Sequence, residues 1–176
     1  MLANYLRLIA FAFGLLIGVQ VPGFVDQYAK RVSAHQIEVS RNFAGFQQTA
    51  DQYFGSDVEA LIAHHAVSAD APFRDEARTI EAMFRRLKEF AAELAALQGP
   101  LIKQIFHVAF RPNREIFGET RAAYSYTVPL NLPAIATGII IAVLLAAMVE
   151  MLLTGVLRLL RPLRPRSALK QSAGQY

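Results

Sequence analysis

The stretch from Pro133 to Val149 contains no charged residue and constrains this chain more than any other feature. A helix of roughly twenty apolar residues crosses a hydrocarbon core of about 30 Å. With 176 residues, of which 54% are hydrophobic, the chain is too apolar for an ordinary soluble domain and too short for a transporter with many spans. We therefore expect a C-terminal membrane span within residues 128–160.

A second uncharged run extends from Leu8 to Val25, which is close to the lower length limit for a span. It also resembles a signal peptide, because Arg7 precedes it and residues 32–34 form a V-x-A pattern. Two basic residues separate that pattern from the apolar run, which places it too far downstream for cleavage. We expect an uncleaved N-terminal span within residues 1–25.

Small residues recur four apart in both runs, and this spacing lets helix backbones approach closely. One interpretation is that the two faces pack against each other; the other is that small residues are simply common in spans. The residues of these faces are Ala10, Gly14 and Gly18 in the first run and Gly138, Ala142 and Ala146 in the second.

The net charge of +4 is unevenly distributed. Acidic and basic residues nearly balance over residues 26–121, which argues against nucleic-acid binding. The basic excess flanks the apolar runs, and this bias predicts that both termini are cytoplasmic and that residues 26–127 are periplasmic. The residues responsible are Arg7 and, towards or within a basic tail over residues 161–176, Arg158, Arg161, Arg164, Arg166 and Lys170.

The middle region has helical periodicity in two long stretches. Gly99 and Pro100 should interrupt the second stretch, and Ser56 with Glu59 predicts the start of a short helix between the two. The pattern indicates an all-α membrane protein, in which two transmembrane helices are linked by a long antiparallel helical hairpin with a coiled-coil-like seam. The apolar positions are Tyr28, Val32, His35, Val39, Phe43, Phe46, Ala50 and Tyr53, followed by Phe73, Ala77, Ile80, Phe84, Leu87, Ala91, Leu94, Gln98, Leu101, Ile105 and Val108.

Catalytic chemistry has no support at the level of residues. Cysteine is absent, which removes disulfides and thiolate ligands. His64 and His65 are adjacent, so on a helix they point about 100° apart and do not form an i, i+4 metal pair. His35 lies on an apolar stripe, where we expect packing with one nitrogen satisfied. We expect no enzyme activity, no cofactor and no metal.

Glu150 is the one acidic residue within the second apolar helix. An ionisable group inside a span is by default a candidate for a proton, ion or partner contact. Its position near the cytoplasmic boundary favours a second interpretation, in which it reaches the headgroups or pairs with Arg7.

Basic and aromatic residues flank the predicted spans in the manner of interfacial anchors, with Tyr124 and Tyr126 preceding the second span. The arginines near them either bind lipid headgroups or form salt bridges along a juxtamembrane helix. The predicted headgroup contacts are Arg111, Arg114, Arg121, Arg158, Arg161 and Arg164.

The order of three segments resembles a known family. These are GxxxGVQVPGFVDQYAKR, SDVEALIAHHAVSADAPFRDEARTI and YSYTVPLNLPA, which together extend over most of the chain. The chain resembles the small two-span inner-membrane proteins of proteobacteria that are described only as a domain of unknown function. The resemblance implies a Gram-negative inner membrane, without an activity or catalytic residues.

These patterns favour a non-catalytic accessory or scaffolding subunit of an inner-membrane complex. Its expected partners are membrane lipids and other membrane subunits or itself, bound through the small-residue faces and the periplasmic hairpin. One alternative is a homo-oligomeric channel or transport component with Glu150, Thr137 and Thr154 near a pore. Another is a membrane protein that binds lipid or quinone.

Overall fold

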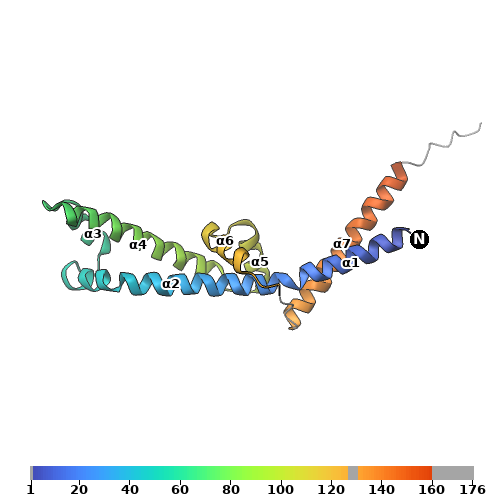
Figure 1. Cartoon of the computed structure of the whole chain (residues 1–176), viewed down its shortest axis with the longest axis horizontal. Coiled ribbons are helices and arrows are strands. Elements are labelled where there is room, and N and C mark those ends of the chain that lie inside the picture. The colour runs from blue at the N-terminus through green and yellow to red at the C-terminus, as the bar shows by residue number, and fades with distance from the viewer. Residues whose placement is uncertain (1, 127–130, 160–176) are drawn as a thin grey trace, which may run out of the picture. The chain divides into compact units, whose positions relative to one another are not determined.

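The computed structural model describes residues 2–126 and 131–159, and every regular element in these ranges is an α-helix. The described residues divide into two compact units, one combining those up to Gly18 with those from Gly138 onwards and the other formed by those from Val19 to Thr137. The helices are α1 (Leu2–Gly18), α2 (Gln20–Tyr53), α3 (Val58–Ala66), α4 (Ala71–Ala96), α5 (Leu101–Phe110), α6 (Arg114–Ala123) and α7 (Leu132–Leu159) (Figure 1).

Two helical segments are long and apolar enough to cross a membrane. One lies near the N-terminus, within Asn4–Tyr53, and the other is Leu132–Gly155 in α7. Large apolar side chains on these segments are exposed, as expected for helices that contact lipid or protein over most of their surface. Examples are Phe13, Leu16, Ile17, Ile139, Ile140, Val143 and Leu144.

In the second unit, α4 packs along α2, and α3, α5 and α6 also contact α2 or α4 (Figure 1). The apolar periodicity places two core clusters along this pair. One cluster is built on Tyr28, Val32, Phe90, Val108 and Ile116 with their neighbours, and the other on Phe43, Ala50, Val58, Leu61 and Ile80. In the second cluster the rings of Phe43 and Phe84 stack, with centroids 5.6 Å apart.

The breaks between the helices follow local chemistry. Gly99 has φ +115° and precedes Pro100, so α4 ends before this pair and α5 begins after it, as predicted. The predicted N-cap at Ser56 is wrong. Ser56 has φ +67°, and Asp57 is the N-cap of α3, where its carboxylate accepts hydrogen bonds from two backbone amides.

The predicted apolar stripes are also displaced at some positions. Phe90 is buried, whereas the predicted seam residue Ala91 is exposed, as are Phe73 and Tyr53 near the ends of their helices. The regular alternation of three and four residues drifts relative to 3.6 residues per turn, so over a long helix it selects a neighbouring position. At α7, the side chain of Asn131 accepts a hydrogen bond from the Ala134 amide and caps the helix.

Candidate functional site

The small residues of α1 and α7 lie in close contact within the first unit. Gly14 is the tightest position, because a Cβ built there would lie 2.7 Å from Ala142 Cα and 3.2 Å from Ala142 N. Backbone atoms cannot yield as a flexible side chain can, so only glycine fits at residue 14. Of the six predicted positions, Ala10, Gly14, Gly18, Gly138 and Ala142 are buried and Ala146 is half-buried.

Arg7 and Glu150 form an ion pair in the same unit, with Nη2 of Arg7 2.9 Å from Oε1 of Glu150. Both side chains are partly exposed. The Thr154 hydroxyl donates to the Glu150 carbonyl oxygen at 2.9 Å, and the Thr137 hydroxyl donates to the Pro133 carbonyl oxygen at 2.7 Å. The polar groups of α7 therefore bind Arg7 or the helix's own backbone.

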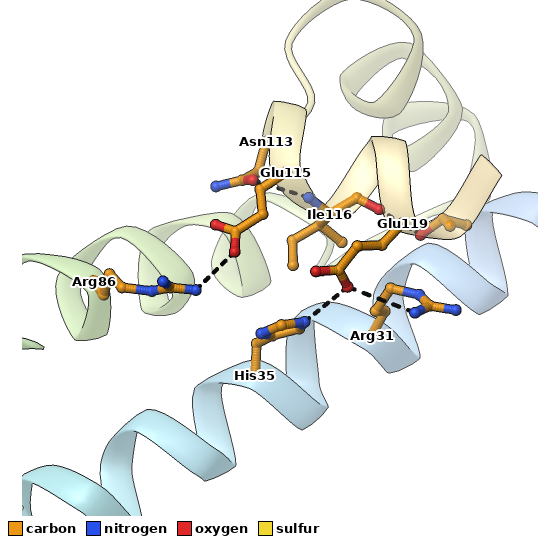
Figure 2. Close-up of polar contacts among 8 residues, drawn as sticks. Arg31, His35, Arg86, Asn113, Glu115, Ile116 and Glu119 are labelled. Carbon is orange, nitrogen blue, oxygen red and sulfur yellow. Dashed lines mark hydrogen bonds and ion pairs between the residues drawn. The ribbon is translucent and has the colours of Figure 1, made fainter. Parts of the chain in front are cut away.

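A second set of polar contacts fastens α6 to the long helices of the second unit (Figure 2). Glu119 of α6 accepts a hydrogen bond of 2.9 Å from Nε2 of His35 and lies 3.5 Å from Nη1 of Arg31, both on α2. The hydrogen bond from His35 lowers the pKa of the Glu119 carboxyl below its ordinary value, and the charge of Arg31 adds to this effect. As expected, the His35 ring also packs, with its centroid 5.5 Å from that of Phe90.

Glu115, one turn earlier on α6, binds α4 instead. Its Oε1 lies 2.9 Å from Nη2 of Arg86 (Figure 2). The guanidinium of Arg86 lies 5.3 Å from the centroid of the Phe90 ring. Asn113 caps α6 by accepting a hydrogen bond from the Ile116 amide. Carboxylates spaced four residues apart thus reach two different helices from one side of α6.

A second, partly buried network was not predicted. The Tyr28 hydroxyl donates to Glu93 at 2.5 Å and accepts from the Asn113 amide at 2.8 Å, while Nε2 of His107 lies 2.7 Å from the same Glu93 oxygen. Burial raises the pKa of the Tyr28 hydroxyl above its ordinary value, and the bond to Glu93 adds to the shift. The network joins α2, α4, α5 and the residue that caps α6.

One sequence signal for this network existed. Glu93 follows Phe90 by three residues and precedes Leu97 by four, so a carboxylate falls on the buried face of α4. A buried carboxylate needs partners. Nothing in the local pattern identifies Tyr28 and His107 as these partners, because Tyr28 lies 65 residues away in the sequence.

The structure describes the side chains of three of the six arginines that were predicted to contact lipid headgroups. Arg111, Arg114 and Arg121 are exposed, and none of them forms an ion pair within the described residues. Arg158 belongs to α7, but its side chain is not described, and Arg161 and Arg164 lie outside the described residues.

A cleft of about 260 Å³ in the second unit is lined by residues of α2 and α4 that include His35, Asn42 and Met83. Over residues 2–126 and 131–159, no three His, Asp or Glu side chains are grouped to hold a metal ion. The histidines either bind a carboxylate or pack on aromatic rings, as His64 does on Phe54. The geometry described here holds helices together.

No curated protein and no solved structure matches the chain. A family model described as "Protein of unknown function (DUF2937)" matches residues 2–162. The chain therefore belongs to this family of unknown function.

Proposed function

We propose that this protein is a non-catalytic accessory subunit of a bacterial inner-membrane complex. In this proposal α1 and α7 cross the membrane, both termini are cytoplasmic, and α2 to α6 form a periplasmic helical hairpin that contacts a partner subunit or a second copy. The apolar character of α1 and α7 supports the membrane location. The pairing of Tyr28, early in α2, with Glu93, late in α4, supports the antiparallel arrangement.

The observation that carries the proposal is how the polar groups are used. The contacts of Glu93, Glu115, Glu119 and Glu150 all join one helix to another. Long helices with such internal contacts present a large, rigid surface, which suits a scaffold. At about 1.5 Å per residue, α2 alone is about 50 Å long.

Contact with a protein partner fits best at the end of the second unit formed by the C-terminus of α2, α3 and the start of α4 (Figure 1). Three apolar side chains are exposed there: Tyr53 by 69%, Val67 by 82% and Phe73 by 48%. Exposed apolar groups that gather at one end of a unit are typical of interaction surfaces.

The conduction alternative has less support. A pore needs polar groups free to face the permeant ion, whereas Glu150 binds Arg7, and the hydroxyls of Thr137 and Thr154 bond to their own helix. Ion flux through liposomes that contain the purified chain, lost in Glu150→Ala, would reverse this preference.

The test of the main proposal is extraction of the full chain from native membranes in mild detergent, followed by measurement of the particle mass and of its protein content. We expect a discrete complex with a partner subunit or a second copy. Tyr53→Lys combined with Val67→Lys should reduce recovery of the partner about tenfold or more, since the two exposed apolar groups become charged. The matched control is Ala92→Lys with Ala96→Lys, at exposed positions of α4. This control should not reduce recovery of the partner. A monomer that carries only lipid would contradict the proposal.

A further inference from the structure

Helix α5 is apolar on two opposite sides. Leu101, Ile105 and Val108 pack into or against the core of the second unit. The remaining apolar side chains form an outward face, in which the rings of Phe106 and Phe110 stack with centroids 6.0 Å apart. Within this face Ile102 is 58% exposed, Phe106 58% and Phe110 76%. Leaving two adjacent phenyl rings in water is costly, so this face calls for a covering partner.

The position of α5 within the unit indicates what covers it. Val108 shares a core cluster with Val25 and Tyr28. Val25 is the last residue of the first apolar run, so α5 packs beside α2 at the level where that run ends. In a chain that crosses the membrane through this run, that level is the boundary between acyl chains and headgroups.

The charged side chains of the segment that carries the outward face are all of one sign. No acidic residue occurs between Glu93 and Glu115. In this interval Lys103 lies on α5 and Arg111 directly follows it, and both are exposed without an ion pair in the described part of the chain. Unpaired cations beside an apolar face complement lipid phosphates above acyl chains. A soluble protein partner could cover this face only if it carried acidic residues around an apolar centre. No observation on the described residues points to such a partner.

We propose that α5 is an interfacial helix, which inserts Ile102, Phe106 and Phe110 into the bilayer surface where α2 leaves the membrane. Lys103 and Arg111 bind the phosphates of anionic phospholipids. The inference rests on the proposed membrane location. The inference adds a second membrane attachment to that proposal. Helix α5 holds the second unit against the lipid surface.

Tryptophan fluorescence tests this directly, because the chain contains no tryptophan. Phe106→Trp and Phe110→Trp are introduced singly into the full chain, which is reconstituted in vesicles of phosphatidylcholine and phosphatidylglycerol brominated near the top of the acyl chains. We expect quenching by the brominated lipid several-fold stronger than in Ala44→Trp, an exposed position in the second half of α2 and outside the proposed partner surface. Aqueous iodide should quench Ala44→Trp more strongly than the two α5 variants. Quenching of the α5 variants by iodide at the level of Ala44→Trp, or by neither agent, would overturn the inference, since the second result means that protein covers the face.

Phe13→Trp separates the two proposals, because Phe13 lies on α1 and is 60% exposed. Brominated lipid should quench this variant strongly if α1 spans the membrane. Quenching at residue 13 without quenching at residues 106 and 110 removes only the inference about α5. Absence of quenching at all three positions removes both proposals.

The role of the cations is tested in the Phe106→Trp background. Phosphatidylglycerol should strengthen quenching by brominated lipid relative to phosphatidylcholine alone, and Lys103→Gln with Arg111→Gln should abolish this increase. Arg78→Gln with Arg85→Gln, two exposed arginines of α4, removes the same charge elsewhere and should preserve it. An increase that survives loss of Lys103 and Arg111 would overturn the assignment of the phosphate contacts.

Discussion

Residue 14 sets the distance between two helices. An alanine Cβ there would meet the backbone of Ala142 at 2.7 Å, so Gly14→Ala is expected to destabilise the protein by about 1–3 kcal/mol. Gly45→Ala is the matched control, because Gly45 lies inside α2 with nothing within 4 Å of the added Cβ, and the change should preserve or raise stability. Thermal melting in detergent, followed by circular dichroism, measures both. Equal melting temperatures would contradict the close approach of α1 and α7.

The Tyr28 hydroxyl joins α2 to α4 and to the residue that caps α6. Tyr28→Phe leaves the Asn113 amide without its acceptor and removes one donor from Glu93, in a place that water does not reach freely. We expect a loss of about 1–3 kcal/mol in the free energy of unfolding. Tyr53→Phe, at a tyrosine that is 69% exposed, should change it little. Urea titration of the two variants gives the comparison, and similar losses would argue against the buried network.

Glu119 makes stability depend on pH. Its pKa is lower in the folded chain than its ordinary value, so the unfolded chain binds a proton first as the pH falls. The stabilisation is present above about pH 5 and is lost as the pH falls through the carboxyl range. The difference in melting temperature between the wild type and Glu119→Gln should therefore shrink from pH 7 to pH 3. The corresponding difference for Glu38→Gln, at an exposed glutamate of α2, should stay small throughout; a constant difference for Glu119→Gln would refute the linkage.

At the scale of the element, the N-termini of α3 and α4 allow a test of how much a side-chain cap stabilises a helix. Asp57 accepts hydrogen bonds from the amides of Glu59 and Ala60, whereas Asp70 occupies the N-cap position of α4 without a side-chain cap hydrogen bond. Asp57→Ala is expected to cost about 0.5–2 kcal/mol, and Asp70→Ala clearly less. Chemical denaturation of both variants decides this. Equal costs would mean that the charge of each aspartate near its helix N-terminus matters more than the hydrogen bonds.

The helix boundaries show which features could be predicted from local sequence patterns. The interruption at Gly99 and Pro100 was predictable because it depends on backbone geometry at those two residues. The cap at Asp57 was missed by one residue, since Ser56 and Asp57 are both good N-cap residues and only the positive φ of Ser56 separates them. The contact of Arg7 with Glu150 was one of two predicted alternatives, because Arg7 precedes the first apolar run and Glu150 follows the charge-free part of the second, at ends that the predicted topology places on the same side of the membrane.

The contacts of α6 lay beyond the sequence patterns for a different reason. Glu119 meets His35 over 84 residues, and Arg86 meets Glu115 over 29. Exposed carboxylates on a short helix have many candidate partners, and periodicity does not rank them. The buried residues Ile116 and Thr120 fix the position of α6 against the other helices. This position determines which cation each carboxylate contacts.

At the scale of the whole molecule, the compact units are defined by packing and do not test the predicted division into membrane and extramembrane parts. Residues 26–127 stay the predicted extramembrane part, and the second compact unit is formed by residues 19–137. Pro22 and Val25 belong to the first apolar run but are buried within the second unit. The core of that unit therefore begins inside the stretch that is apolar enough to enter a membrane, and apolar composition alone does not separate the two.

The orientation of the whole chain is open to direct test, because the absence of cysteine allows single labels. Val67→Cys places a thiol in an 82% exposed position between α3 and α4, and Ser167→Cys places one in the basic tail. A membrane-impermeant maleimide applied to cells with a permeabilised outer membrane should label Val67→Cys before lysis and Ser167→Cys only after it. The expectation depends on the basic residues that flank the spans. Labelling of both sites only after lysis would place the helical unit and the basic tail on the same, cytoplasmic side, and α7 would then not cross the membrane.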